Sequence, residues 1–253
     1  MKFLLAFLFL LSFSLSTAQP TDPIFIGHRG GFLPGIPENS LMAFQHCIAE
    51  HVAMIETDIQ LTKDKQMVLF HDKSLLRMTG VNGKLSEYTL AELQQMDLGY
   101  NQYIPTLEEA LIILQSGTIN LLLDIKAGDD LDYTTLYTLL EYYQMTSRVF
   151  IGVRSLKDLK TCKTLNTHIK VLGFVPGPEY IDTFITSQAD AIRIWPNYLK
   201  EQPDLISEVL QQHIPVWMTV GAMPNQEIML WADQGVTGFI HDTPKAAELA
   251  FKH

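Results

Sequence analysis

Two residues suited to phosphate chemistry stand side by side near the start of the chain. His28 and Arg29 follow the apolar run 24–27 and precede Gly30 and Gly31. An imidazole exchanges protons near neutral pH, and a guanidinium binds phosphate oxygens through parallel hydrogen bonds. Glycines at this point let the backbone approach a ligand closely. The pair therefore indicates a phosphate site at a strand end, with capping of a loop as the structural alternative.

Acidic residues recur at the ends of two further apolar runs. Glu56 and Asp58 would lie on one face of a strand, because side chains of extended chain alternate between faces. Asp124 and Lys126 end the run LLLDIK with the same spacing. Adjacent carboxylates repel unless a cation lies between them, and oxygen ligands suit Ca²⁺ or Mg²⁺. We expect Glu56, Asp58 and Asp124 to form a divalent-ion site and Lys126 to contact a phosphoryl oxygen. The alternatives are a solvated acidic edge for Glu56 and Asp58, and a buried ion pair for Asp124 and Lys126.

A second histidine, His71, follows a predicted hairpin. Residues 59–62 and 67–70 have strand-like composition and flank the polar segment 63–66. A two-residue loop at the centre of that segment would place His71 opposite Asp58. This register predicts that His71 lies beside the acidic cluster.

Polar residues in the loop after the first strand and at the end of the last strand are further candidates. Asn39 or Ser40 is predicted to cap the helix that follows, and Glu38 to orient Arg29 from the loop. His241, at the end of the last predicted strand, either borders the same mouth or has a structural role.

Strands and helices alternate regularly along the chain and must position these residues. Eight short β-branched runs are predicted strands: 24–27, 52–58, 119–125, 149–153, 170–175, 191–195, 215–220 and 238–241. Eight amphipathic runs are predicted helices: 40–50, 107–115, 133–143, 156–165, 180–187, 204–212, 226–234 and 244–251. This alternation predicts an α/β fold, the (β/α)8 or TIM barrel, whose active sites form at the strand C-termini. The alternative is an open doubly wound sheet, which favours a G-x-G-x-x-G phosphate loop that GHRGG lacks.

One stretch interrupts the alternation. Residues 59–105 separate the second strand from its helix and are far longer than an ordinary connection, which is typical of functional loops. We predict a hairpin followed by an insertion at about 72–105. No linker-like tract divides the rest, so 19–253 is predicted to be a single barrel domain.

Composition and charge narrow the class of protein. Of 253 residues, 47% are apolar and 18% charged, which is enough apolar surface to form a core and excludes a disordered chain. The net charge of −10 disfavours nucleic acid and anionic membrane surfaces as partners.

The first 18 residues have the pattern of a secretion signal. Lys2 precedes an apolar run at 3–11 and a small-residue segment ending at Ala18. We expect cleavage after Ala18, a secreted or periplasmic protein and no stable membrane anchor. Cys47 and Cys162 could pair in such a compartment, but their helical surroundings favour buried free thiols.

The motifs taken together resemble a known family. GHRGG, PENSLMAF, ETD, FHDKSLLRMTG, IPTLEEAL, LLLDIK and GFIHDTP occur in this order. They are similar to the glycerophosphodiester phosphodiesterase family of TIM-barrel hydrolases, most specifically over the first hundred residues after the leader. The resemblance implies that His28 and His71 are the acid and base. It also implies that Arg29 binds the phosphate and that Glu56 and Asp58 hold one divalent cation.

Two positions depart from the family pattern. Asp124 stands where the family usually has a glutamate as third metal ligand, and in this respect the chain is similar to sphingomyelinase D-like phospholipases. Met218 and Gly221 stand where the family often has Trp and Asn, which predicts a less polar mouth and tolerance of larger leaving groups.

The resemblance implies metal-dependent hydrolysis of glycerophosphodiesters to sn-glycerol 3-phosphate and an alcohol. In its implied route the substrate's own glycerol hydroxyl attacks phosphorus, and water then opens the cyclic phosphate. The alternatives are a phospholipase D-like enzyme acting on lysolipids or sphingomyelin, and a non-catalytic barrel that binds a phosphorylated ligand. The headgroup, the identity of the ion and the oligomeric state do not follow from the sequence.

Overall fold

The computed structural model describes residues 22–252, and the predicted secretion signal lies outside them. Its strands are β1 (Ile24–Gly27), β2 (Met54–Leu61), β3 (Met67–Leu69), β4 (Asn120–Ile125), β5 (Val149–Val153), β6 (Lys170–Gly173), β7 (Ala191–Ile194), β8 (Val216–Gly221) and β9 (Gly238–His241). Its helices are α1 (Leu41–Ala49), α2 (Leu76–Thr79), α3 (Leu90–Leu93), α4 (Leu107–Leu114), α5 (Tyr133–Tyr142), α6 (Leu156–Leu165), α7 (Ile181–Thr186), α8 (Leu205–Gln211), α9 (Asn225–Asp233) and α10 (Pro244–Phe251). Short 3-10 helices are η1 (His28–Gly30), η2 (Leu85–Glu87), η3 (Gly128–Asp130), η4 (Thr146–Arg148), η5 (Pro178–Tyr180) and η6 (Pro196–Lys200).

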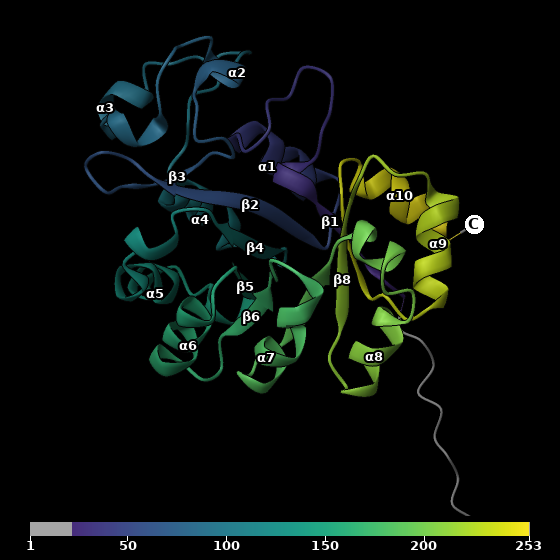
Figure 1. Ribbon diagram of the computed structural model, residues 1–253. Helices are drawn as coiled ribbons and strands as arrows, with labels where there is room; N and C mark the ends of the chain where they lie inside the picture. Colours follow the sequence, from purple (N-terminus) through teal and green to yellow (C-terminus); the bar gives the residue numbers. More distant parts are fainter. Residues whose placement is uncertain (1–21, 253) are drawn as a thin grey trace, which may run out of the picture.

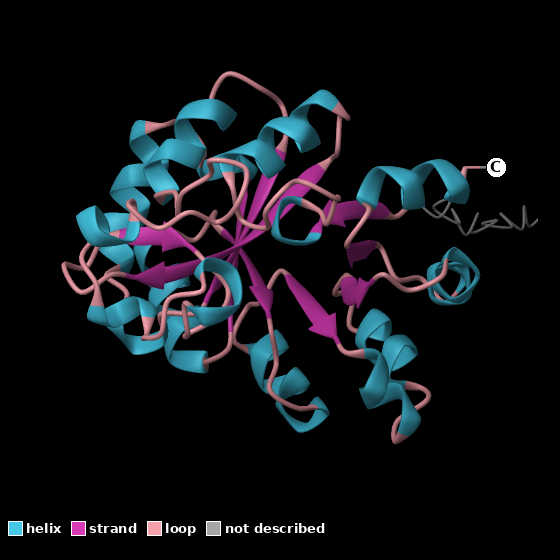
Figure 2. Ribbon diagram, turned by 90° about the horizontal axis from the view of Figure 1, so that it is seen from above, coloured by secondary structure: helices cyan, strands magenta, loops and turns pink. Residues whose placement is uncertain are grey.

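Eight of the strands close into a parallel barrel. The order is β1-β9-β8-β7-β6-β5-β4-β2, and β1 also pairs with β2, which completes the ring. The helices surround the strands (Figure 2). The predicted TIM barrel is therefore confirmed.

Alternation along the strands separates the interior of the barrel from the layer under the helices. Apolar side chains fill the interior at one end, among them Ile26, Met54, Leu122 and Trp217. The intervening residues of the same strands, such as Ile55, pack outward beneath the helices. The inward positions that follow toward the strand C-termini are polar, so the charged groups lie directly above an apolar floor.

The hairpin exists, but its predicted register is wrong by one residue. Strand β2 continues through the first predicted arm, and Ile59 pairs with Leu69. The turn has three residues between Thr62 and Gln66, with Lys65 in the left-handed conformation (φ 63°), because such a loop closes with one left-handed residue. Asp58 consequently stands opposite Phe70, whose N–H donates to the Asp58 carbonyl oxygen, and not opposite His71.

The insertion after β3 has a small core of its own. Helices α2 and α3 lie beyond β3, apart from the helices that surround the barrel (Figure 1). A separate buried cluster joins the hairpin to the insertion: Val68, Phe70, Leu75, Leu85, Leu93, Leu98 and Ile104. This packing fixes residues 71–77 above the barrel mouth.

The structure of residues 22–252 shows the state of the two cysteines and the character of the helices. Cys47 and Cys162 are buried free thiols, and burial raises the pKa of each to about 12. The Cys47 thiol donates to the Gly30 carbonyl oxygen at 3.0 Å, which supports the loop after β1. Within the same range, every helix is too short or too polar to cross a bilayer.

Candidate active site

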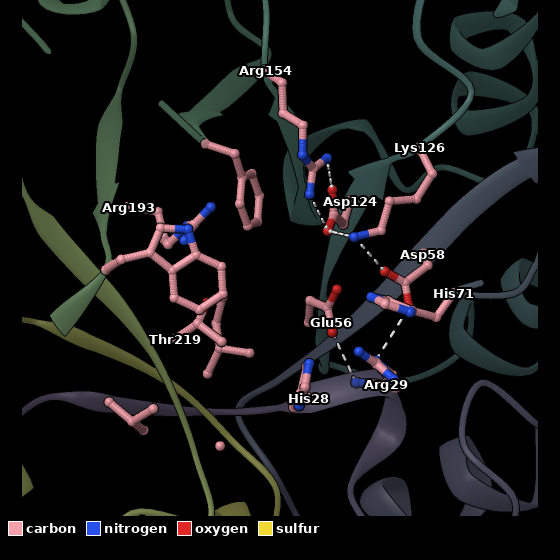
Figure 3. Close-up of a pocket in the computed structure, with 15 residues that line it drawn as sticks. His28, Arg29, Glu56, Asp58, His71, Asp124, Lys126, Arg154, Arg193 and Thr219 are labelled. Atoms are coloured by element: carbon pink, nitrogen blue, oxygen red, sulfur yellow. Dashed lines mark hydrogen bonds and ion pairs between the residues drawn. The ribbon is translucent and has the colours of Figure 1, made fainter. Parts of the chain in front are cut away.

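A cavity of about 360 Å³ opens at the C-terminal ends of the strands. Each of the eight barrel strands, or the segment that follows it, contributes to the lining. The predicted residues His28, Arg29, Glu56, Asp58, His71, Asp124 and Lys126 all line it (Figure 3). Glu38 lies behind them, in contact with Arg29.

Three buried carboxylates converge in this cavity. One oxygen each from Glu56, Asp58 and Asp124 lies within 4.8 Å of the others. The cause is local: Glu56 and Asp58 share the inward face of β2, and Asp58 is the register partner of Asp124 on β4. Burial raises the pKa of Glu56 well above 4.5, and the neighbouring Asp58 and Asp124 charges add to the rise. A buried acidic set of this kind fits a hard divalent cation.

Asp124 is the most heavily paired of the three. Lys126 Nζ lies 2.6 Å from Asp124 Oδ2 and 3.1 Å from Asp58 Oδ1, so the ammonium bridges two carboxylates. Arg154 donates to both Asp124 oxygens, one of them at 2.8 Å. Burial would raise the pKa of Asp124, but these two cations hold it below its usual value.

Arg29 is anchored on three sides. Its backbone is left-handed (φ 53°), and its backbone N–H donates to Glu56 Oε2 at 2.8 Å. Its guanidinium donates to Glu38 at 2.9 Å, and its Nε lies 3.6 Å from Asp58. Glu38 thus makes the contact with Arg29 that the sequence predicted.

The two residues after Glu38, Asn39 and Ser40, have different structural roles. Ser40 caps α1 by accepting from the Ala43 N–H. Asn39 turns toward β2 instead, where its amide donates to Asp58 Oδ2 at 2.8 Å and accepts from the Thr57 hydroxyl at 2.7 Å. Asn39 therefore fixes the orientation of one carboxylate in the acidic set.

Each cavity histidine is hydrogen-bonded to a carboxylate. His28 Nδ1 lies 2.7 Å from Asp242 Oδ1, and His71 Nδ1 lies 2.7 Å from Asp72 Oδ1. An ionised carboxylate only accepts, so in both rings Nδ1 carries the proton and Nε2 is left for the cavity. His28 and His71 line the same cavity as Arg29 and Glu56 (Figure 3).

Arg77 links the two loops that carry this machinery. It donates to Asp72 at 2.5 Å from Nε and to Glu38 at 2.9 and 2.6 Å from its terminal nitrogens. Burial would raise the pKa values of Asp72 and Glu38, but the hydrogen bonds from Arg77 and the second partner of each, His71 or Arg29, lower both. The insertion thereby reaches back to the Arg29 loop.

Several residues of the site escaped the sequence analysis. Asp242, Asp72, Arg77, Arg154 and Arg193 come from scattered segments. The dipeptide HD occurs after β3 and again at the end of β9, and in each case the acid holds an active-site histidine. This repeat was the available signal.

One expectation about the mouth is corrected, and the open question about His241 is answered. Met218 points outward into the core under the helices, because the inward positions of β8 are Trp217 and Thr219, so Met218 does not shape the mouth. Gly221 does line the cavity. His241 is buried outside the lining, where its Nδ1 accepts from the Thr243 N–H at 2.9 Å.

The chain has relatives among known proteins. The model of the glycerophosphoryl diester phosphodiesterase family matches residues 28–246. A glycerophosphodiester phosphodiesterase of Caldanaerobacter subterraneus is 27% identical over 232 residues, which span 87% of this chain and 94% of that protein. Human lysophospholipase D GDPD1 is 30% identical over 160 residues, which span 58% of this chain and 50% of that protein.

Solved structures agree in fold. A glycerophosphoryl diester phosphodiesterase of Parabacteroides distasonis has a TM-score of 0.78 and 27% identity, with 93% of this chain and 88% of that one covered. An Oleispira antarctica phosphodiesterase, solved with sn-glycerol-3-phosphate, has a TM-score of 0.82 at 22% identity, with 91% and 97% covered. The carboxylates, the paired histidines and the match over most of its length place this chain in the glycerophosphoryl diester phosphodiesterase family.

Proposed function

We propose that this protein hydrolyses glycerophosphodiesters to sn-glycerol 3-phosphate and an alcohol with the help of one divalent cation, Ca²⁺ or Mg²⁺. The observation that carries the proposal is the convergence of Glu56, Asp58 and Asp124 beside two histidines that each bear a carboxylate partner. Family membership supports the reaction class.

The carboxylates are proposed to hold the cation. Glu56 fits best, because it is 3% exposed and its hydrogen bond is to a backbone N–H, with no side-chain cation as partner among the described residues. A divalent cation bound there would neutralise charge on the phosphoryl oxygens and lower the pKa of the attacking hydroxyl. Asp58 and Asp124 would contribute the remaining protein oxygens.

Arg29 and Lys126 are proposed to bind the phosphate. Both reach the cavity beside the carboxylates, and both are held by acids, which limits the conformational entropy lost on binding. Glu38 serves as the positioning residue for Arg29. A phosphate on these cations would lie next to both imidazole rings.

His28 and His71 are proposed to move the protons. In the first step Nε2 of one ring takes the proton of the glycerol hydroxyl as its oxygen bonds to phosphorus. Nε2 of the other ring protonates the alcohol oxygen as its bond to phosphorus breaks. Water then opens the cyclic phosphate with the two roles reversed. Asp242 and Asp72 stabilise each ring when it is cationic.

Hydrolysis of sn-glycero-3-phosphocholine by the purified chain tests the proposal. We expect release of sn-glycerol 3-phosphate, loss of activity with chelator and recovery with Ca²⁺ or Mg²⁺. His28→Ala and His71→Ala should each lose about 10²-fold or more. Chelator-insensitive turnover would contradict the role of the cation, and a faster reaction with lysophosphatidylcholine would favour the phospholipase D-like alternative. Equal rates on bis-p-nitrophenyl phosphate, which has no neighbouring hydroxyl, would contradict the cyclic route.

We also propose export. The pattern at 1–18 supports a secreted or periplasmic location after cleavage at Ala18. N-terminal sequencing of the protein recovered from the producing cells tests this, and a retained Met1 would contradict it.

A further inference from the structure

Arg193 is a buried cation without a polar partner. It is 2% exposed, yet its Nε and Nη1 make no hydrogen bond within residues 22–252. It occupies an inward position of β7, two residues after Ala191, and it lines the active-site cavity. Burying an unpaired charge is costly, so an arginine in this place indicates a partner that arrives with the ligand.

Aromatic rings prepare the place for this side chain. The Arg193 guanidinium carbon lies 3.8 Å from the centre of the Trp195 ring and 4.7 Å from that of Phe174. The Phe174 ring lies over Gly152, where any Cβ would come within 2.0 Å of it. Cation–π contact stabilises the charge and leaves the N–H groups of the guanidinium without hydrogen-bond acceptors. The side chain is therefore held in place with its donors free.

The other cations in the described lining already face acids. Arg29 faces Glu38, while Lys126 and Arg154 share Asp124. Burial lowers the pKa of Arg193 to about 9, so it remains charged at neutral pH. Arg193 alone among these four has an unmatched charge.

The position of Arg193 decides which part of the substrate reaches it. In the ring of eight strands β7 is diametrically opposite β2, which carries Glu56 and Asp58. Figure 3 shows Arg193 across the cavity from Lys126 and Asp58. The scissile phosphate belongs with those residues under the proposed function, and the glycerol part has only hydroxyls, so a second anionic group has to be on the alcohol part.

We propose that Arg193, framed by Phe174 and Trp195, binds an anionic group on the alcohol part of the diester, a carboxylate or a phosphate. The inference rests on the proposed function and specifies its substrate class. Glycerophosphodiesters whose alcohol part carries an anionic group would be preferred over those whose alcohol part carries none.

Two diesters that differ by one carboxylate test this directly. sn-Glycero-3-phosphoserine is sn-glycero-3-phosphoethanolamine with a carboxylate added. We expect kcat/KM to favour the serine diester by about tenfold or more, the scale of a charge-assisted bidentate contact. Arg193→Met should bring the ratio to about one, and Arg193→Lys should restore part of it. Lys170→Met is the matched control, because Lys170 also lies over an aromatic ring, Phe150, but starts β6 at the other end of the barrel.

Calorimetry separates binding from turnover. With His71→Ala as the binding protein, the serine diester should bind about tenfold more tightly, and the added Arg193→Met should abolish the difference. Equal binding of the two diesters, or an equal loss on both in Arg193→Met, would overturn the proposal, the latter because Arg193 would then act on the scissile phosphate. If neither diester is hydrolysed the proposed function fails, and the binding preference still decides the role of Arg193.

Discussion

At the residue scale the site depends on how each acid is partnered. Asp124 shares its charge with Lys126 and Arg154, whereas Glu56 has only a backbone donor. The difference appears in their pKa values, which shift in opposite directions. Glu56 is therefore the carboxylate that most needs an added cation.

This asymmetry predicts a pH dependence of ion binding. Because the pKa of Glu56 is raised in the metal-free protein, protons and the ion compete for this carboxylate, and the affinity for the ion should weaken as pH falls. A raised folded-state pKa contributes stability at low pH that is lost as pH rises through it, so the gain in stability on adding ion should grow with pH. Calorimetric titration with Ca²⁺ at pH 6 to 8, in buffers of different ionisation enthalpy, measures the proton release. An affinity that does not change with pH would contradict the assignment.

For ion binding, the charge of each carboxylate should matter more than the length of its side chain. Glu56→Gln keeps the size of the side chain but removes its charge, and should abolish ion binding. Asp58→Asn and Asp124→Asn should lower activity by several orders. Asp124→Glu is the matched control that keeps the charge. Wild-type ion binding by any of the three neutral variants would remove that residue from the set.

At the element scale the insertion completes the site. Its small apolar core places α2 above the mouth, and from there Arg77 contacts both Asp72 and Glu38. These acids hold His71 and Arg29, so one arginine of the insertion contacts the partners of both the proposed proton-transfer group and the proposed phosphate-binding group.

Arg77→Met tests that link. We expect kcat/KM to fall about tenfold, a modest loss because Arg77 is itself half exposed. Both kcat, through His71, and KM, through Arg29, should change. Lys73→Met removes an exposed charge in the same insertion and should have no effect. Unchanged kinetics in Arg77→Met would show that the two loops hold their positions without it.

The strands could be predicted because the barrel core as a whole requires their apolar residues, whatever the conformation of individual turn residues. The hairpin register was not, because the conformation of one turn residue, Lys65, decides whether the loop has two or three residues. Arg154 was missed for a different reason: it reaches the site from the segment after β5, far along the sequence, where no motif marks it. Asp242 lies in the motif GFIHDTP, but only the fold shows that its carboxylate contacts His28. Arg193 could have been noticed, because it is a charged residue at an inward position of an otherwise apolar strand.

At the scale of the whole molecule the barrel brings charges of both signs to one end. Acidic residues outnumber basic ones over the chain, yet four cations line the mouth among the described residues. An ion bound among the carboxylates, as proposed, would join β2 to β4 and so stabilise the folded state.

Thermal unfolding should register the ion. At a free concentration of 100 Kd the ion stabilises the folded state by about 2.7 kcal/mol, which corresponds to a rise in Tm of about 5 to 10 °C for a protein of this size. Chelator should reverse the rise, and Glu56→Gln should not show it. An equal rise in Glu56→Gln would place the stabilising ion elsewhere.

The most direct test is a crystal structure with Mn²⁺ and sn-glycerol 3-phosphate, using anomalous scattering to locate the ion. We predict one anomalous peak among Glu56, Asp58 and Asp124, with the phosphate on Arg29 and Lys126 and within hydrogen-bond reach of Nε2 of His28 and His71. A peak outside these carboxylates, or a phosphate bound away from the two histidines, would contradict the account.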